Sequence, residues 1–382
     1  MELSLEEIVN LYNPDAPLEE AFTIPAEWYA DLQMDELERR AVFGRTWQLM
    51  GRAEHVAEPG QYITAEVAGE PIVVVRGQDG VLRGFFNVCR HHAAAVVTEA
   101  AGKAAQFRCP YHGWTYSTEG ALKGMPEFEG VCNFDRAQNG LVGVPAETWE
   151  KFVFVNLDPA AKPLSDFLGR LAARVAPLRL DTLHFFERRT YELRCNWKVY
   201  VDNFLDGGYH VPHLHKGLNS VLEYVNYTIE NQDRFCLQAS PLKASSEDSA
   251  AAATRRGEMA YYFWQYPNFM LNWYEGYLDT NLVLPLGIDR CLVIFDFYFS
   301  RTQTDDYNRQ SISVSDRVQA EDVDICEAVQ RGLHSRAYRA GRLSVRREAG
   351  EHLFHRLLHA DLKAALASKT PAKIQTASNP AR

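Results

Sequence analysis

The chain has 382 residues, of which 46% are hydrophobic and 24% charged, and its formal net charge is −10. This length suits two domains, or one domain with another inserted, and the composition supports a sizeable core. The acidic balance argues against binding to nucleic acid or to an anionic membrane surface.

The N-terminal sequence MELSLEEIVN has no basic or apolar signal region, and no run approaches the roughly 18 apolar residues of a membrane span. We therefore predict a cytoplasmic protein that does not enter a membrane. The seven cysteines are odd in number and widely spread, which disfavours a disulfide framework. We expect five of them to be buried small hydrophobic side chains, and Cys89 and Cys109 to be the exceptions.

Four segments follow one another along the chain. Residues 1–44 are partly helical, with an amphipathic helix predicted over residues 34–47. Residues 45–155 contain short β-rich runs separated by glycine-containing turns, which predicts a small all-β unit. Residues 156–367 alternate helices with longer strands, including strands over 283–286 and 291–299 and a helix over 315–332. Residues 368–382 are polar and aperiodic, and we predict a disordered tail.

The all-β segment contains two Cys-His pairs. Cys89 and His91 form a C-x-H motif, and Cys109 and His112 form a C-x-x-H motif followed by Gly-Trp. A Rieske [2Fe–2S] cluster requires two cysteines on one iron and two histidines on the other. Replacing anionic thiolates with neutral imidazoles raises the reduction potential, so that the cluster can accept electrons from a ferredoxin-like donor.

A structural zinc site is the alternative for these four residues. Zinc sites more often pair Cys with Cys and His with His, so mixed pairs in both halves favour the cluster. The neighbouring His92 competes with His91 for the ligand position. Because C-x-H is the Rieske spacing, we assign His91 as the ligand and His92 to the surface or to a supporting position.

A second group of ligand-type residues lies in the segment 195–215. His210 and His215 are five residues apart, about 140° around an unbroken helix, and we expect Pro212 to interrupt the helix between them. Two histidines and one carboxylate on Fe(II) leave positions open for O₂ beside a substrate. Spacing alone does not exclude His213 as a ligand. Asp206, one helical turn before His210, is placed to orient that histidine or to lie at the surface.

The third ligand is expected from the long predicted helix over 315–332. Three of its apolar residues share one face: Val318, Ile325 and Val329. Asp322 falls within that face, whereas Glu321 lies at its edge and Asp324 points away. Because a buried carboxylate needs a partner, we predict that Asp322 binds the metal. A buried salt bridge is the alternative.

These motifs give the chain a family resemblance. CRHHA at 89–93, CPYHGW at 109–114, the segment 195–215, and the runs at 266–287 and 316–333 resemble the α subunits of Rieske non-haem iron ring-hydroxylating oxygenases, most closely the choline monooxygenase branch. The resemblance covers roughly residues 20 to 365. It implies an α+β fold, in which a Rieske domain (45–155) is inserted in a helix-grip (START-like) catalytic domain with a large antiparallel sheet (1–44 and 156–367).

The resemblance also implies roles for individual residues. It implies iron ligation by His210, His215 and Asp322. It further implies a ring of subunits, usually a homotrimer, in which the cluster of one subunit reduces the iron of its neighbour across a bridging carboxylate. Much of the family places this acid three residues before the first iron histidine. Here that position is Gly207, so we assign the bridge to Asp206.

The substrate is predicted from an aromatic segment. Residues 261–277 include nine aromatic side chains among seventeen, and aromatic faces bind quaternary ammonium groups. Trp273, Tyr274 and Tyr277 are the candidates, with Glu275 or Asp279 as anionic support. An aromatic sheet core explains the same composition. With the resemblance, we predict hydroxylation or N-demethylation of choline or a related trimethylammonium compound. The alternative is an aromatic ring or aromatic acid dioxygenase.

The predicted reaction needs a redox partner. An NAD(P)H-dependent flavin or iron–sulfur reductase, or a ferredoxin, would reduce the cluster, and we expect a docking patch at Arg90, Lys103 and Arg108. A Rieske protein that only transfers electrons is a further alternative. It would have no use for the predicted mononuclear iron site.

Overall fold

A computed structural model describes residues 3–243 and 249–368. Within them the chain forms two compact units. One unit combines the segment that ends at Glu38 with Leu168–Leu366, and the other spans Arg39–Phe167. We call them the discontinuous unit and the inserted unit. Apart from Ser368, the tail predicted over 368–382 lies outside the described residues.

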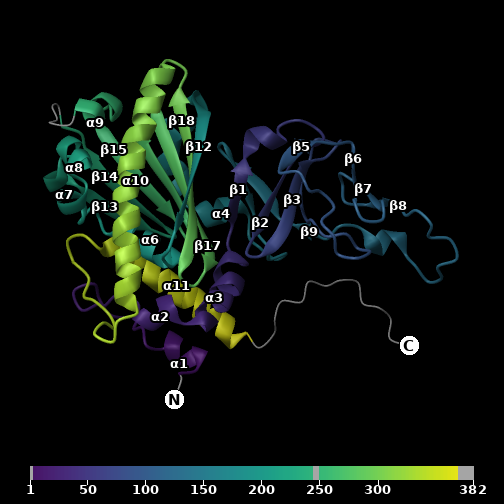
Figure 1. Cartoon of the computed structure of the whole chain (residues 1–382), viewed down its shortest axis with the longest axis horizontal. Helices are drawn as coiled ribbons and strands as arrows, with labels where there is room; N and C mark the ends of the chain where they lie inside the picture. Colours follow the sequence, from purple (N-terminus) through teal and green to yellow (C-terminus); the bar gives the residue numbers. More distant parts are fainter. Residues whose placement is uncertain (1–2, 244–248, 369–382) are drawn as a thin grey trace. The chain divides into compact units, whose positions relative to one another are not determined.

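The inserted unit is built from short antiparallel strands (Figure 1). Its three sheets have the strand orders β1-β11-β10, β5-β2-β3-β4-β9 and β6-β7-β8. The strands are β1 (Gln48–Arg52), β2 (Gln61–Val67), β3 (Glu70–Arg76), β4 (Leu82–Phe86), β5 (Ala101–Lys103), β6 (Gln106–Arg108), β7 (Thr115–Ser117), β8 (Leu122–Gly124), β9 (Gly143–Val144), β10 (Ala146–Trp149) and β11 (Phe152–Val155). The short helices are η1 (Arg39–Phe43), η2 (Ala53–Val56), η3 (Arg136–Asn139) and α4 (Leu164–Leu168), the last at the unit boundary.

Two hydrophobic clusters stabilise the inserted unit, one on each side of β3. Alternate residues of that strand point in opposite directions, so Val73 and Val75 enter one cluster while Ile72 and Val74 enter the other. The cluster that contains Val73 also contains Cys89 and Cys109. Both predicted cluster cysteines therefore belong to a packed core from which their loops extend.

The discontinuous unit is dominated by a seven-stranded sheet in which every neighbouring pair is antiparallel, with the order β12-β18-β17-β16-β15-β14-β13. Its strands are β12 (Leu183–Leu193), β13 (Thr228–Gln232), β14 (Phe235–Pro241), β15 (Met259–Gln265), β16 (Phe269–Tyr274), β17 (Tyr277–Gly287) and β18 (Arg290–Ser300). Its helices are α1 (Leu5–Val9), α2 (Ala26–Ala30), α3 (Leu32–Glu38), α5 (Leu171–Val175), η4 (Ala176–Leu178), η5 (Leu180–Thr182), α6 (Trp197–Leu205), α7 (Val211–Leu214), α8 (Lys216–Val221), η6 (Tyr224–Asn226), α9 (Ser249–Thr254), α10 (Asp305–Leu333) and α11 (Ala349–Ala367).

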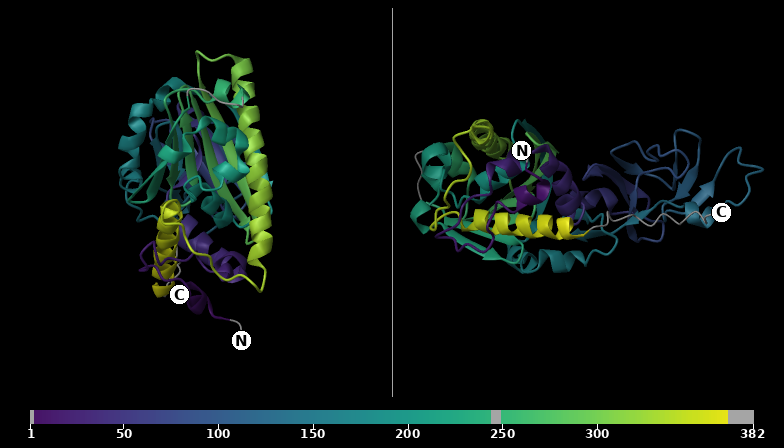
Figure 2. Two further views of the ribbon diagram at one scale, coloured as in Figure 1. Left: turned by 90° about the vertical axis from the view of Figure 1, so that its left-hand side faces the viewer. Right: turned by 90° about the horizontal axis from the view of Figure 1, so that it is seen from below.

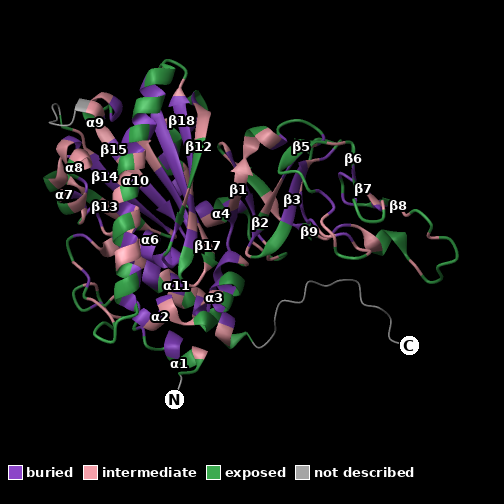
Figure 3. Ribbon diagram, in the orientation of Figure 1, coloured by how far each residue is buried: buried purple, intermediate pink, exposed green. Residues whose placement is uncertain are grey.

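Helix α10 runs along one face of this sheet (Figure 2). It begins ten residues before the predicted start at 315, because the Thr304 side chain accepts the amide hydrogen of Tyr307 and caps the helix. Asp305 and Asp306 add negative charge in the first turn, which favours the helix N-terminus. The outer side of α10 is exposed, while the sheet beneath it is buried (Figure 3).

Two predictions about local structure were wrong. The helix predicted over 34–47 ends as a π-helix at Phe43, followed by Gly44, whose added Cβ would lie 3.0 Å from the Arg40 carbonyl oxygen. Trp47 therefore lies beyond the helix, where its indole donates to the Lys162 carbonyl at 3.0 Å. All seven cysteines are free, as expected, but Cys132 is exposed rather than buried because it lies in an open loop between β8 and η3.

Candidate metal centres and substrate cavity

Two loops of similar shape carry the Cys-His pairs of the inserted unit. In each loop the amide four residues after the cysteine donates to the cysteine carbonyl: Ala93 to Cys89 at 3.0 Å, and Gly113 to Cys109 at 3.1 Å. Both donors adopt the left-handed conformation, with φ of 61° and 72°. A non-glycine residue in this region is strained by about 1–2 kcal/mol, so the Cys89 loop is held by its surroundings.

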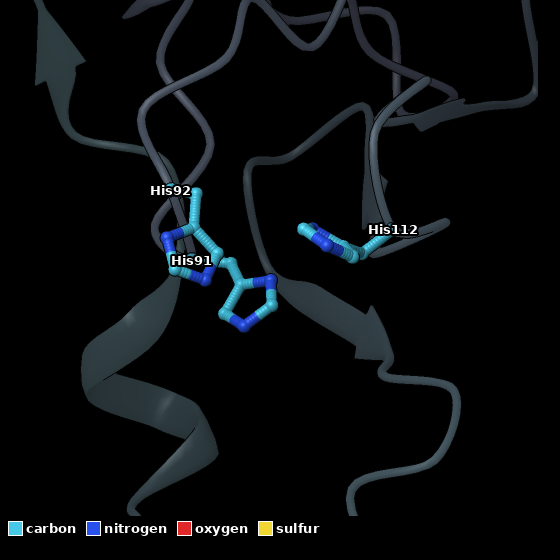
Figure 4. Close-up of side chains that lie close together, drawn as sticks. All are labelled: His91, His92 and His112. Atoms are coloured by element: carbon cyan, nitrogen blue, oxygen red, sulfur yellow. The ribbon is translucent and has the colours of Figure 1, made fainter.

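The cysteine and histidine side chains of the two loops differ in burial. The Cys89 and Cys109 thiols are buried, whereas the His112 imidazole is exposed and His91 is half-buried. The rings of His91, His92 and His112 converge (Figure 4), with 4.7 Å between the centroids of His91 and His112. Buried thiols and more exposed imidazoles fit a cluster that its cysteines bind to the protein core and that receives electrons on the side of its histidines.

The contacts of His91 favour this residue as a ligand. They do not exclude His92, which lies in the same group of convergent histidines. The His91 ring stacks on Trp114 at 4.7 Å and 4°, and its buried Nδ1 has no hydrogen-bond partner. His92 is exposed, but its ring centroid lies 4.1 Å from that of His91. The group of convergent ligand atoms contains His91, His92 and His112 but neither cysteine. An orphaned buried nitrogen among these imidazoles, on loops that also carry two buried cysteines, fits a metal cluster at this position.

Other residues around the loops shape the same region. The Tyr116 hydroxyl lies 3.4 Å from the Cys89 sulfur and accepts the Arg90 amide hydrogen at 3.0 Å. Burial raises the pKa of the Cys109 thiol, so a bound metal is needed to hold it as a thiolate. Of the residues proposed as a docking patch, Lys103 pairs with Glu58 at 2.9 Å.

In the discontinuous unit, the segment before His210 is shaped by two glycines. Helix α6 ends at Leu205, and Gly207 and Gly208 follow with φ of 67° and 68°. A Cβ at Gly207 would lie 2.0 Å from the Arg347 carbonyl oxygen. The helix is therefore interrupted at the glycines, before His210, and not at Pro212 as we predicted.

Pro212 lies in the first turn of the short helix α7, where proline costs no hydrogen bond. His210 caps the start of α7 and His215 caps its end. The short helix therefore directs both imidazoles toward one point, with 4.8 Å between their ring centroids. His213, the competing ligand, is exposed and outside this group.

Asp322 completes a possible metal site with these histidines. One ligand atom from each of His210, His215 and Asp322 lies within 4.8 Å of the others. Asp206 Oδ2 lies 2.6 Å from His210 Nδ1, and Glu321 Oε2 lies 2.6 Å from His215 Nδ1. With each Nδ1 engaged by a carboxylate, each Nε2 is left for a metal, an arrangement typical of metal-binding histidines.

The electrostatics of this site also fit a cation. Burial lowers the pKa of the His215 imidazole, but hydrogen bonds and charges from Asp322 and Glu321 outweigh burial and raise it. Asp322 also accepts a hydrogen bond from Asn203 at 2.8 Å. The clustered carboxylates therefore favour positive charge where the imidazole Nε2 atoms point. The role of Glu321 was missed, because its partner His215 is 106 residues away.

The apolar stripe of α10 from which Asp322 was predicted is not buried. Ile325 and Val329, which we expected to form a buried stripe, are 38% and 44% exposed. The buried side of α10 is instead largely polar. It includes Ser311, Ser315, Gln319, Asp322, Cys326 and Gln330. Asp322 is buried because this polar side faces the sheet and α6, and Asp324 is exposed as predicted.

A cavity of about 130 Å³ adjoins the three candidate ligands. An engineered cavity of about 150 Å³ admits benzene, so this one suits a small substrate. Its aromatic wall consists of Tyr200, Phe204, Tyr227, Tyr262, Tyr274 and Phe295. The Tyr227 and Tyr262 rings stack with 6.4 Å between centroids, and the hydroxyls of Tyr262 and Tyr274 are 2.6 Å apart.

The predicted aromatic residues are divided by the alternation of strand β16. Asn272 and Tyr274 face the cavity, whereas Trp273 points to the opposite side and lines a different hollow with Arg256 and Glu275. The structure therefore does not bring Trp273 or Glu275 to the candidate metal site. The alternation along the strand does not show, from sequence alone, which of the two sets of side chains faces the cavity.

Tyr274 and Tyr277 contact a cation of the protein itself. The Arg255 guanidinium lies 5.0 Å from the Tyr274 ring centroid and 4.6 Å from that of Tyr277, and it donates to Ser315 Oγ at 2.7 Å. Tyr277 does not line the cavity, and its hydroxyl contacts Asp279. The cavity wall thus carries a buried cation, Arg255, and a buried carboxylate, Asp279.

Known protein families match both units of the chain. Residues 46–135 match the Rieske [2Fe-2S] domain, and residues 180–364 match the ring hydroxylating alpha subunit (catalytic domain). The chain is 38% identical over 372 residues to choline monooxygenase, chloroplastic, of Arabidopsis thaliana, covering 94% of this chain and 87% of the relative. The chain belongs to the Rieske ring-hydroxylating oxygenase α subunits.

Other members of the family are also similar. The carnitine monooxygenase oxygenase subunit of Escherichia coli K12 is 34% identical over 327 residues, covering 84% of this chain and 87% of the relative. A crystal structure of the quaternary ammonium Rieske monooxygenase CntA, solved in complex with an inhibitor, has a TM-score of 0.81 and 29% identity, covering 95% of this chain and 99% of that chain. Naphthalene 1,2-dioxygenase, with a TM-score of 0.75 and 19% identity, shares the fold.

The predicted family, fold class and enzyme class are confirmed. The chain is a Rieske oxygenase with a Rieske domain and a catalytic domain that contains a large antiparallel sheet. The two matched domains imply a Rieske [2Fe–2S] cluster and a mononuclear iron. The family works with O₂, small substrates and a reductase or ferredoxin. Within the described residues, no helix is long and apolar enough to cross a membrane.

Proposed function

We propose that this oxygenase hydroxylates choline or a related trimethylammonium compound with O₂ and electrons derived from NAD(P)H. The observation that carries the proposal is a small cavity whose wall combines tyrosine rings with His210, His215 and Asp322. The relatives named choline monooxygenase and carnitine monooxygenase support the substrate class.

We assign the metal ligands from the donor sets described above. Cys89, His91, Cys109 and His112 hold the cluster, and His210, His215 and Asp322 hold the iron. Iron bound at the second site supplies reductive activation of O₂ next to the substrate C–H bond.

The outer carboxylates support these ligands. Asp206 and Glu321 accept the Nδ1 hydrogens of His210 and His215, which fixes the ring orientation and tautomer. Asp206 is also the proposed bridge to the cluster of a neighbouring subunit in a homotrimer.

The cavity wall accounts for recognition of the substrate. The π faces of Tyr227, Tyr262 and Tyr274 attract a quaternary ammonium group. Asp279 and Arg255 place a buried negative and a buried positive charge in the same wall. A substrate with a cationic head and a polar or anionic tail can complement both. We further propose an NAD(P)H-dependent reductase as electron donor and a cytoplasmic location.

Product analysis tests the proposal directly. The holoenzyme would be supplied with NADH, a generic reductase and ¹⁸O₂, and offered choline, glycine betaine, carnitine or benzoate separately. We expect labelled product from at least one trimethylammonium compound, with solvent exchange of aldehydes controlled. Product from benzoate alone would refute the substrate class while leaving the metal assignments intact. Loss of product in the Asp322→Ala variant would tie the reaction to the mononuclear site.

A further inference from the structure

The cavity beside the candidate iron ligands has a buried guanidinium in its wall. Arg255, the residue after α9, is 7% exposed and lines the cavity together with His210 and Asp322. Its two terminal nitrogens donate to Ser311 Oγ at 2.8 Å and to Ser315 Oγ at 2.7 Å. Both acceptors are neutral, so these hydrogen bonds position the guanidinium and leave its positive charge in place.

Arg255 has no ion-pair partner among the described residues. Within them, no Asp or Glu oxygen lies within 4.0 Å of its guanidinium. The carboxylate in the same cavity wall, Asp279, instead accepts hydrogen bonds from Asn272 at 2.6 Å and from Asn281 at 3.1 Å. Because an isolated buried charge is costly, a buried guanidinium normally has an anionic partner. The cavity is the open side from which an anion can pair with Arg255.

Aromatic side chains connect Arg255 with the segment that carries the candidate iron histidines. The Tyr227 ring packs on Gly208 of that segment, where an added Cβ would lie 3.1 Å from Tyr227 Cε2. Tyr227 stacks on Tyr262 with 6.4 Å between centroids, and the hydroxyls of Tyr262 and Tyr274 are 2.6 Å apart. The Arg255 guanidinium lies 5.0 Å from the Tyr274 ring centroid. The wall therefore passes from π faces beside the histidine segment to a cation.

Helix α10 places Arg255 and the candidate iron site at separate positions along the cavity. Ser315, which accepts from Arg255, precedes Asp322 by seven residues, or about 10 Å along the helix axis. Both residues lie on the buried side of α10 and line the cavity. A substrate with one end at Arg255 therefore extends along the tyrosine rings toward the candidate iron ligands.

We propose that Arg255 binds a carboxylate of the substrate, so that the enzyme prefers zwitterionic trimethylammonium carboxylates to choline. This inference rests on the proposed function and narrows its substrate class. The carboxylate pairs with N–H groups of Arg255 that the two serines leave free, and the trimethylammonium group lies against Tyr227 and Tyr262. This orientation directs the ammonium end of the substrate toward the iron site. Choline ends in a neutral hydroxyl and cannot neutralise Arg255.

Calorimetric titration of the anaerobic holoenzyme tests the proposal without any substitution. The probes are choline and trimethylammonium carboxylates with one, two or three methylenes between the charges, each paired with its methyl ester. The ester keeps the ammonium group but lacks the negative charge. We expect at least one acid to bind at least about tenfold more tightly than its ester. Equal binding of every acid and its ester would overturn the inference and leave the proposed function standing. Binding of none of these compounds would overturn both.

Variants then assign the preference to one residue. Arg255→Gln should reduce the difference between acid and ester to less than about threefold, while the ester still binds and so reports an intact cavity. Arg255→Lys keeps the positive charge and should restore part of the preference. Arg256→Gln is the matched control, because the Arg256 guanidinium lies 4.5 Å from the Tyr307 ring centroid and lines a different hollow. An Arg255→Gln protein that prefers the acid as strongly as the wild type would overturn the assignment.

Discussion

At the residue scale, Asp322 is the carboxylate that we propose as an iron ligand. It accepts from Asn203 at 2.8 Å, lies 3.1 Å from His215 Nε2, and is 9% exposed. A carboxylate this buried requires a charge partner. Its neighbour Asp324 is exposed on the same helix and gives a matched control.

Asp322→Asn should therefore empty the mononuclear site and spare the cluster. Outer partners of metal ligands are worth about 10–100-fold in affinity, so loss of a direct ligand should weaken iron binding by more than about 100-fold. Iron analysis should show the mononuclear iron lost, while the visible absorption of the cluster remains. Asp324→Asn should retain both. Full mononuclear iron in Asp322→Asn would remove this residue from the ligand set.

Tyr262 belongs to the same cavity and tests recognition of the ammonium group. Tyr262→Leu keeps an apolar wall but removes the aromatic face. We expect KM for choline to rise about 5–30-fold, corresponding to about 1–2 kcal/mol of cation–π attraction. Binding of 3,3-dimethylbutanol, the uncharged isostere, should change much less. Equal losses for both ligands would indicate a packing role for Tyr262.

At the element scale, α10 and the segment after α6 position the site. Helix α10 presents a largely polar buried side, where Ser311 and Ser315 accept from Arg255, and Gln319 accepts from Tyr200. A helix that only packed on the sheet would bury apolar residues there. The polar side is thus explained by the cavity and the metal site rather than by the core.

Gly207 allows the chain to turn from α6 toward His210. Gly207→Ala would place a Cβ 2.0 Å from the Arg347 carbonyl oxygen in a left-handed conformation. The variant should lose at least about 1–3 kcal/mol of folding free energy and should bind mononuclear iron poorly. Gly332→Ala, where the new Cβ meets nothing within 4 Å, should be neutral or stabilising by up to about 1 kcal/mol. Chemical denaturation and iron analysis measure both effects.

At the scale of the whole molecule, the two units have separate cores and separate candidate metal centres. Cys89 and Cys109 belong to a hydrophobic cluster of the inserted unit, whereas His210, His215 and Asp322 all lie in the discontinuous unit. Each unit is held by its own sheets. Loss of one metal centre should therefore leave the fold of the other unit intact.

A Cys109→Ala/His112→Ala variant tests this independence. We expect the visible absorption of the cluster to vanish, because each iron of the cluster loses a ligand. The mononuclear iron should be retained, and the thermal transition of the discontinuous unit should shift by less than about 4 °C. Cys132→Ala, at an exposed loop cysteine, is the control. Loss of both metal centres in the first variant would show that the units fold as one.

The sequence by itself determined the family and the residue types of the candidate sites. The C-x-H and C-x-x-H pairs, His210 and His215 are short-range patterns, so their residue types and spacing were readable without a fold. The family followed from the same motifs. Asp322 was predicted correctly as a buried residue, although the apolar stripe used to choose it is largely exposed.

Only the tertiary structure decided which distant side chains meet. Glu321 contacts His215 across 106 residues, and Arg255, the residue after α9, contacts Tyr274 of the aromatic segment. Side chains alternate along β16, so Trp273 and Tyr274 must point to opposite faces of the sheet. Only the packing of the strand decides which of the two faces lines the cavity. Spacing along the chain records local geometry, whereas these contacts depend on the register and packing of the sheet.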